Sequence, residues 1–462
     1  MEKMKKFKKR LIPLILAVVM LVTPNMFPQT AAAVTEKRYP TFFCHGLLGW
    51  GYTDAIDSIM PYWGMGAGNL LGFLRDKGYE VHNLSVGSVS SAWDRACEMY
   101  AQITGRSVDY GQAHCDRENA QYLAIAQARG ESSAALTHSR YGRDYSGQAL
   151  YPEWSAVNKI NLVGHSFGGP SCELLINLLA EGDPYEIAWG REQVALHGGS
   201  ISDYVSPLFL GGKVAWVNSL TTLASVLNGT TFISACGEET EALSNICLGL
   251  ANAIGVSSLN RIYDFQLEQF GLTNVPGQSG EAYLDCVLQS DFLKGSDQAW
   301  YDLSVSGCNE LNKRLKTYDN IYYFSYAGNM TYKSSLTNSY LPNTGMFALF
   351  MPFSAKIGSY TNSSEYVLDK GGMVYRDGYT YSSISSAWEP NDGMVNTISA
   401  RYPLNQAHKV FDSGSISPGV WQVMPDQTMD HLQFCGGLGN SDANGIRQFY
   451  TGIMQNIDAT QT

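Results

Sequence analysis

The pentapeptide GHSFG at positions 164–168 places Ser166 between two glycines. This spacing is typical of a nucleophile elbow, where small neighbours let the chain turn sharply and present the serine hydroxyl. The pentapeptide alone is a weak signal, and an ordinary glycine-rich turn is the alternative. Its position is more specific, because it follows the apolar run 160–163 and precedes the helical pattern PSCELLINLLAEG. We therefore predict that Ser166 is the nucleophile of an acyl-transfer site.

Such a site also needs two backbone amides that stabilise the oxyanion. The amide of Phe167, which follows the predicted nucleophile, is one candidate. The second should come from the loop after an earlier strand, and HGLLG at 45–49 follows the strand-like run YPTFFC. We predict that Leu47 supplies this amide, because Gly46 allows a close approach of the backbone.

The acid and the base of such a site follow the serine in the order Ser, Asp, His. His431, in DQTMDHL, lies in a predicted loop before the last helix, where the base is expected, whereas His408 leads into a strand-like run and His197 lies far upstream. The acid, which fixes the histidine tautomer, stays open on spacing alone. The candidates are Asp392, Asp412, Asp426 and Asp430.

The elements that would position these residues alternate between strands and helices. Strand patterns occur at 39–44, 80–87, 159–164, 213–220 and 320–328, and helical patterns occur at 69–78, 91–103, 170–182 and 443–457. This alternation predicts a mostly parallel sheet with helices on both faces. From about 220 to 300 the pattern is helical and irregular, which predicts a lid or cap that includes an amphipathic helix at 238–255.

Composition restricts the class of protein. The chain has 462 residues, of which 45% are hydrophobic and 16% charged, and a net charge of −11. These values exclude a disordered chain and an electrostatic nucleic-acid binder. Nine cysteines are an odd number at low density, so disulfides are not expected to hold the fold together, and their pairing cannot be predicted.

The first 33 residues are predicted to be a secretory signal peptide. A lysine-rich block precedes the apolar run LIPLILAVVMLV, and small residues follow in TAAAV. The run is too short to cross a membrane, and no later run is longer, so we predict a secreted protein without stable membrane insertion. An uncleaved anchor is the alternative.

Five longer motifs resemble those of the zinc-containing secreted lipases of Gram-positive bacteria. They are HGLLGWG, LSVGSVSSAWDRACEMYAQITGRSVDYG, YDLSVSG, NDGMVNT and the GVW and MDHL pair. The resemblance extends from about residue 39 to the last helix. It implies an α/β-hydrolase fold over 34–462, with a helical lid at about 220–300 and a small zinc-bearing insertion at about 91–150. It also implies the triad Ser166, Asp392 and His431, with Leu47 and Phe167 as the oxyanion pair.

The resemblance further implies a zinc site that spacing alone would not predict. Its ligands would be Asp94, His114, His138 and Asp297. Four protein ligands leave no open position, so the zinc would be structural. Cys97 and Cys115 lie close in sequence but are not among the predicted ligands.

Calcium is not included among the predicted sites. Relatives of this kind use a glycine carbonyl such as that of Gly345 and acids after the catalytic histidine. This chain has Gln433 where a glutamate is usual, and no acid before Asp442.

The sequence therefore predicts a secreted lipase that hydrolyses acylglycerol esters at a lipid–water interface through a Ser-His-Asp triad and an acyl-enzyme. A carboxylesterase or polyesterase that acts on short-chain or polymeric esters is the alternative within the same chemistry. A non-catalytic lipid- or wall-binding protein on the same fold is an alternative of a different class.

Overall fold

The structure is a computed structural model that describes residues 38–236, 246, 265–275, 277–438 and 442–461. The predicted signal peptide at 1–33 lies outside the described residues. So does the predicted amphipathic helix at 238–255, apart from Ile246. The description below concerns the unit formed by residues 39–461.

A seven-stranded sheet forms the centre of this unit, in the order β13-β14-β7-β6-β5-β1-β2, and every neighbouring pair is parallel. All five predicted strand patterns contribute to it, so the predicted α/β architecture is confirmed. One strand differs in its bounds, since β6 starts and ends later than the pattern at 213–220. The strands are β1 (Thr41–Cys44), β2 (Val81–Leu84), β5 (Ile160–His165), β6 (Val217–Leu223), β7 (Tyr322–Tyr326), β13 (His408–Val410) and β14 (Trp421–Val423).

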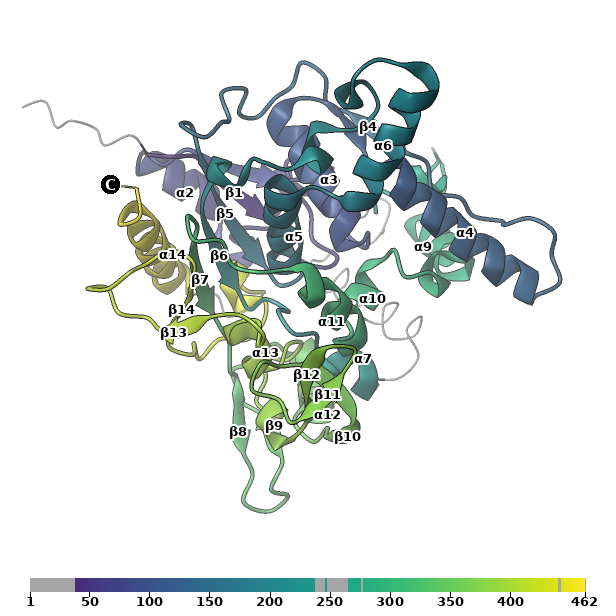
Figure 1. The fold of residues 1–462 in the computed structure, drawn as a ribbon. Coiled ribbons are helices and arrows are strands. Elements are labelled where there is room, and N and C mark those ends of the chain that lie inside the picture. Colours follow the sequence, from purple (N-terminus) through teal and green to yellow (C-terminus); the bar gives the residue numbers. More distant parts are fainter. Residues whose placement is uncertain (1–37, 237–245, 247–264, 276, 439–441, 462) are drawn as a thin grey trace, which may run out of the picture. The chain divides into compact units, whose positions relative to one another are not determined.

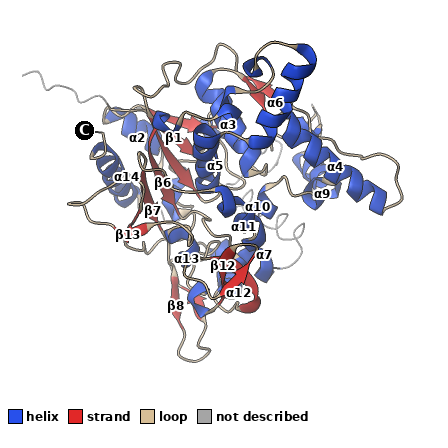
Figure 2. Ribbon diagram, viewed as in Figure 1, coloured by secondary structure: helices blue, strands red, loops and turns tan. Residues whose placement is uncertain are grey.

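The sheet is buried on both faces, as its continuous apolar runs require. Successive side chains of a strand point to opposite faces, so Phe42 and Leu162 lie in one core and Phe43 and Val163 in the other. Helices α3 (Ala92–Thr104) and α5 (Gly168–Glu181) cover the Phe42 face. Helices α2 (Leu70–Asp76) and α14 (Ala443–Asp458) cover the opposite face, and Figures 1 and 2 show the two pairs on either side of the sheet.

Local sequence signals set the ends of these helices. The Ser91 hydroxyl accepts a hydrogen bond from the amide of Asp94 and so caps the start of α3. Gly105 ends α3 in the left-handed conformation, at φ 66°. Gly182 ends α5, as the sequence predicts.

The remaining elements surround this core. Small antiparallel sheets are formed by β3 (Ser107–Asp109) with β4 (Tyr141–Asp144), β8 (Thr331–Lys333) with β9 (Tyr340–Pro342), and β10 (Asn362–Leu368) and β11 (Val374–Arg376) with β12 (Tyr379–Ile384). The other helices are α4 (Gln112–Ala128), α6 (Pro184–His197), α7 (Thr231–Cys236), α9 (Gly280–Gln289), α10 (Ala299–Leu303), α11 (Val305–Arg314), α12 (Met351–Ile357) and α13 (Thr397–Arg401).

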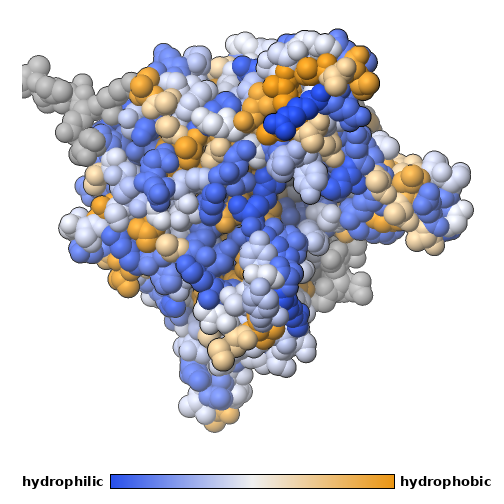
Figure 3. Space-filling view, viewed as in Figure 1, coloured by the Kyte–Doolittle hydropathy of each residue, from blue (hydrophilic) through white to orange (hydrophobic). Residues whose placement is uncertain are grey.

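The surface in Figure 3 is mostly hydrophilic, with small scattered apolar areas. Orange atoms gather over α6, where Leu196 is exposed. None of the helices in the described ranges is long and apolar enough to cross a membrane. The eight cysteines in these ranges are all unpaired, in agreement with a fold that disulfides do not hold together.

Glu173, buried inside α5, makes stability depend on pH. Burial raises its pKa to about 8, and its one side-chain partner is the Gln406 amide at 3.4 Å. As the pH rises from about 4.5 to 8, the unfolded chain releases this proton while the folded chain keeps it. The free energy of unfolding therefore falls by up to ~1.4 kcal/mol per pH unit over this interval. We predict that Glu173→Gln unfolds at a higher temperature than wild type at pH 8.5 and that the difference shrinks at pH 5. An equal difference at both values would contradict the assignment.

Candidate functional site

Ser166 lies at a sharp turn between the end of β5 and the start of α5. Its backbone has φ 55°, and its amide donates to the carbonyl of Leu223 at 2.9 Å. Glycines on either side are required by close approach: a Cβ on Gly168 would lie 2.2 Å from the carbonyl oxygen of Cys44, and one on Gly164 would lie 2.5 Å from the carbonyl oxygen of Gly168. A positive φ in a residue with a side chain is a strained conformation of the kind found at functional turns. The turn therefore has the geometry predicted for a nucleophile elbow.

His431 joins Ser166 to Asp392 in one hydrogen-bonded chain. His431 Nε2 lies 2.9 Å from Ser166 Oγ, and His431 Nδ1 lies 2.8 Å from Asp392 Oδ2. The other carboxylate oxygen of Asp392 accepts from the amides of Met394 and Val395. Because the carboxylate only accepts, Nδ1 carries the proton and Nε2 is free to accept the serine proton. This is the arrangement that activates a serine as a nucleophile.

The rival acids and histidines lie elsewhere. Asp426 pairs with Arg401, Asp412 caps a turn through Gly414 and Ser415, and Asp430 accepts from backbone amides that include that of Phe347. The rival histidines do not belong to this hydrogen-bonded chain. The His408 ring stacks on Tyr402, and His197 is exposed at the end of α6. Geometry thus selects Asp392 and His431, whereas spacing left the aspartate open.

The predicted oxyanion amides belong to two segments that adjoin Ser166, since Phe167 follows it in sequence and Gly46 approaches it closely. Phe167 directly precedes α5 as its N-cap residue, and Leu47 belongs to the loop after β1. Within the described part of the chain, neither amide donates a hydrogen bond to a backbone carbonyl. Arg95 supports both segments, since its guanidinium donates to the carbonyl of His45 and lies 4.9 Å from the Phe167 ring centroid. The two amides are therefore available to an oxygen at Ser166.

A small apolar cavity lies beside Ser166 and His431. Within the described ranges the lining contains no Asp, Glu, Lys or Arg, and most of its side chains are aliphatic or aromatic. The lining includes Leu47, Leu48, Trp50, Tyr62, Met65, His165, Val226, Thr230, Phe232, Ile233, Ile246, Leu303, Phe350, Met394, Val395, Leu432 and Leu438. Such a lining suits contact with a hydrocarbon chain.

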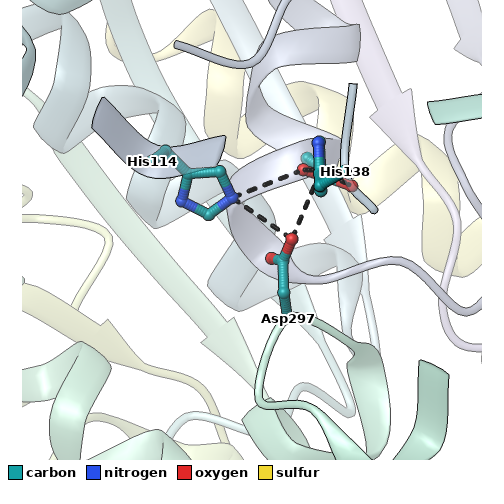
Figure 4. A group of neighbouring side chains, drawn as sticks. His114, His138 and Asp297 are labelled. Atoms are coloured by element: carbon teal, nitrogen blue, oxygen red, sulfur yellow. Dashed lines mark hydrogen bonds and ion pairs between the residues drawn. The ribbon is translucent and has the colours of Figure 1, made fainter. Parts of the chain in front are cut away.

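The four predicted metal ligands also meet in space. Asp94 on α3, His114 on α4, His138 and Asp297 are all buried, and each offers one ligand atom within 4.8 Å of the others. His114 Nε2 lies 3.2 Å from Asp297 Oδ2, and His138 Nε2 lies 3.2 Å from Asp94 Oδ1 and 3.3 Å from Asp297 Oδ2 (Figure 4). A tetrahedral zinc with bonds of about 2.0 Å separates its ligand atoms by about 3.3 Å. The cluster could therefore hold a metal of this size.

Charge also favours a cation at this cluster. Burial and the neighbouring Asp297 carboxylate raise the pKa of Asp94, so two carboxylates are held close together out of water. His138 Nδ1 lies 2.9 Å from the Ser139 carbonyl, which would fix the tautomer that ligates through Nε2. The half-exposed guanidinium of Arg117 lies 2.9 Å from His114 Nδ1 and would have to turn away, because a ligating His114 carries a proton there.

A family described as lipase-like, C-terminal domain, matches residues 37–376 and 379–462. The chain belongs to this family.

Individual proteins agree with this membership. The chain is 32% identical over 415 residues to Lipase 1 of Staphylococcus aureus, which covers 88% of this chain and 53% of that protein. The chain therefore spans about half the length of the curated relatives it matches.

Two solved structures match over nearly their whole lengths. EstA from Clostridium botulinum has a TM-score of 0.75 and 31% identity, over 93% of this chain and 89% of that one. Lipase 1 from Pelosinus fermentans has a TM-score of 0.70 and 35% identity, over 91% and 98%. Together with the parallel sheet, these matches confirm the predicted α/β-hydrolase-like fold.

Sequence reasoning missed three features of this lipase-like domain. Helix α4, which carries His114, is not among the helices that the sequence predicts. Tyr62 and Arg95, which contact the segments on either side of Ser166, were not singled out. The only signal for Arg95 was its place beside Asp94 in the AWDRAC motif.

Gln433 and Asp442, the two residues that the sequence analysis compared with calcium ligands, both accept from backbone amides. The Gln433 side chain accepts from the amide of Asp430 at 2.8 Å, and Asp442 caps the start of α14. Among the described residues, the Asp94 cluster is the only group of at least three candidate ligands that lie so close together.

Proposed function

We propose that this protein is a secreted serine carboxylic-ester hydrolase, and more specifically a triacylglycerol lipase. The observation that carries the proposal is the hydrogen-bonded chain from Ser166 through His431 to Asp392, beside an apolar cavity. Relatives named lipases at 32% identity support it. A non-catalytic lipid-binding protein would have no need of such a chain.

The proposed mechanism follows from these contacts. Ser166 Oγ attacks the ester carbonyl while His431 Nε2 takes its proton. Asp392 accepts from Nδ1 and stabilises the imidazolium that forms. The amides of Leu47 and Phe167 donate to the oxyanion. The alcohol leaves with the proton from His431, and a water molecule then releases the fatty acid from the acyl-enzyme by the same route.

The metal cluster is proposed to hold structural zinc. Asp94, His114, His138 and Asp297 would provide all four ligands, so no position remains for a reacting water. When bound, the ion would neutralise the two buried carboxylates. We also propose a signal peptide at 1–33, followed by one α/β-hydrolase domain. This domain would contain the zinc-bearing insertion at about 91–150 and a lid at about 220–300.

The choice between lipase and simple esterase can be tested with emulsions. The cavity is nearly closed, with Ser166 only 5% and His431 only 7% exposed. For a substrate to reach Ser166, the cavity must open and expose apolar surface. In water this exposure costs about 25 cal/mol per Å², and contact with a lipid phase offsets that cost. We expect fatty-acid release from a long-chain triglyceride to rise once the substrate exceeds its solubility. A flat response, with turnover of short soluble esters only, would favour the esterase.

The cavity should also set the preference for acyl chain length. Ile233 lines the cavity and is only partly buried, so a larger side chain can enter there without disrupting the core. We expect Ile233→Trp to reduce kcat/KM for a sixteen-carbon ester relative to a four-carbon ester by about tenfold. Leu336→Trp, at the exposed tip of the β8–β9 hairpin, is the matched control and should leave the ratio unchanged. An unchanged ratio in Ile233→Trp would mean that the acyl chain binds elsewhere.

A further inference from the structure

A buried hydrogen-bonded chain lies behind the candidate active site. The amide of Gly46 lies 3.0 Å from the hydroxyl oxygen of Tyr62, and this oxygen lies 2.7 Å from His165 Nδ1. On the other side of the same imidazole, Nε2 lies 2.9 Å from the carbonyl oxygen of His431. Tyr62 and His165 are both buried, at 3% and 1% exposure.

Each hydrogen bond of this chain has one possible direction. The His431 carbonyl can only accept, so His165 Nε2 donates to it and carries the ring proton. Nδ1 then accepts from the Tyr62 hydroxyl, whose oxygen accepts from the Gly46 amide. Burial lowers the pKa of His165 well below its ordinary value, in agreement with this neutral tautomer. Every polar group of the chain is paired, which makes such a buried network rigid.

The two ends of this chain are the two segments whose relative position the reaction depends on. Gly46 directly precedes Leu47, whose amide is a proposed oxyanion donor. His431 contacts Ser166 Oγ through its ring and His165 through its carbonyl. These segments come from the loop after β1 and from the loop before α14, so no local structure holds them together. A displacement of a fraction of an ångström between them would separate the oxyanion donor from the general base.

We propose that Tyr62 and His165 are positioning residues that hold the Leu47 segment and the His431 loop in register around Ser166. Neither residue transfers a proton in the reaction. This inference rests on the proposed function, because it assigns these residues a task in ester hydrolysis.

The first test is Tyr62→Phe, which removes only the hydroxyl. Gly46 loses its acceptor and His165 its donor, so we expect kcat for a soluble short-chain ester to fall by about tenfold or more, while KM changes by less than about threefold. Affinity for a trifluoromethyl ketone, which forms a tetrahedral oxyanion adduct with Ser166, should fall by a factor similar to that of kcat/KM. A residue that only stabilised the fold would not shift this affinity.

Tyr323→Phe is the matched control. The Tyr323 hydroxyl is also buried and also accepts from a backbone amide, that of Tyr318 at 3.1 Å, but it does not line the cavity. We expect this variant to lose a similar amount of thermal stability and to keep the wild-type kcat and inhibitor affinity.

His165→Asn provides an independent test, and it carries the proposal if Tyr62→Phe does not fold. The shorter side chain keeps an acceptor near Tyr62 but cannot reach the His431 carbonyl, so kcat and inhibitor affinity should again fall together. In the double variant the two losses should combine to less than their product, because both break one chain.

Activity in Tyr62→Phe and His165→Asn equal to that of Tyr323→Phe would overturn the inference and leave the proposed function intact. Wild-type protein without ester hydrolysis would overturn the proposed function, and this inference with it.

Discussion

Replacing Ser166 with alanine should reduce kcat for ester hydrolysis by about 10⁴-fold or more. In the proposed mechanism this hydroxyl forms the acyl-enzyme, and its oxygen lies 2.9 Å from His431 Nε2. The variant should fold normally, since alanine removes one hydroxyl from a side chain whose backbone is held by the Leu223 carbonyl. Hydrolysis of a chromogenic ester and the midpoint of thermal unfolding are the two measurements.

Ser415→Ala, at an exposed turn, is the control and should keep wild-type activity. Asp392→Asn should also reduce kcat by about 10³-fold or more, because an amide in place of the carboxylate no longer holds the proton on His431 Nδ1. Substantial activity in a clean preparation of Ser166→Ala would show that another residue is the nucleophile.

Loss of the metal should be the largest effect on stability. The four buried ligands bring two carboxylates together, and removal of a compensating cation leaves their charge balanced only in part by the two histidines, at a cost of about 3–5 kcal/mol. For a chain of this size we expect the midpoint of unfolding to fall by about 5 °C after chelation or in His114→Ala. None of the four ligands lines the cavity, so ester hydrolysis below the unfolding temperature should fall far less than stability does.

Elemental analysis should find about one zinc per chain in the wild type and none in His114→Ala. His197→Ala, which changes an exposed histidine at the end of α6, should retain both the metal and the stability. Protein purified without a chelator that contains no bound metal would contradict the proposed centre.

The sequence predicted the parts of the fold whose pattern reflects burial. Strands such as β5 are buried on both faces and read as continuous apolar runs, and α5 shows apolar residues at helical spacing up to Gly182. The nucleophile elbow could be predicted from the same patterns, because the glycines of GHSFG lie between a buried strand and a helix.

Helix α4 could not be predicted in this way. Its buried residues recur at helical spacing, but His114 and Glu118 are polar, so the face that packs inward is not apolar in the sequence. The metal cluster and this helix could not be predicted for the same reason. A buried polar ligand and an exposed polar residue give the same signal in a hydropathy pattern. Only the resemblance in the AWDRAC and GQAHC motifs indicated the ligands.

Contacts between distant segments were also beyond the sequence. Asp392 and Asp430 are equally acceptable by spacing, and only the fold shows that Asp392 faces His431 while Asp430 caps backbone amides. The chain from Gly46 through Tyr62 and His165 to His431 depends on the tertiary arrangement of three segments. His165 lies within the GHSFG pentapeptide, yet the residue type alone does not indicate that its ring contacts both Tyr62 and the His431 carbonyl.

Covalent labelling tests the central claim most directly. A fluorophosphonate reacts with a serine that a neighbouring base has activated, and its attachment site can be read by peptide mass spectrometry. We expect one label per chain, on the peptide that contains Ser166, with labelling lost in Ser166→Ala and strongly slowed in Asp392→Asn. Absence of labelling in folded wild-type protein, or a label on a different serine that persists in Ser166→Ala, would contradict the account.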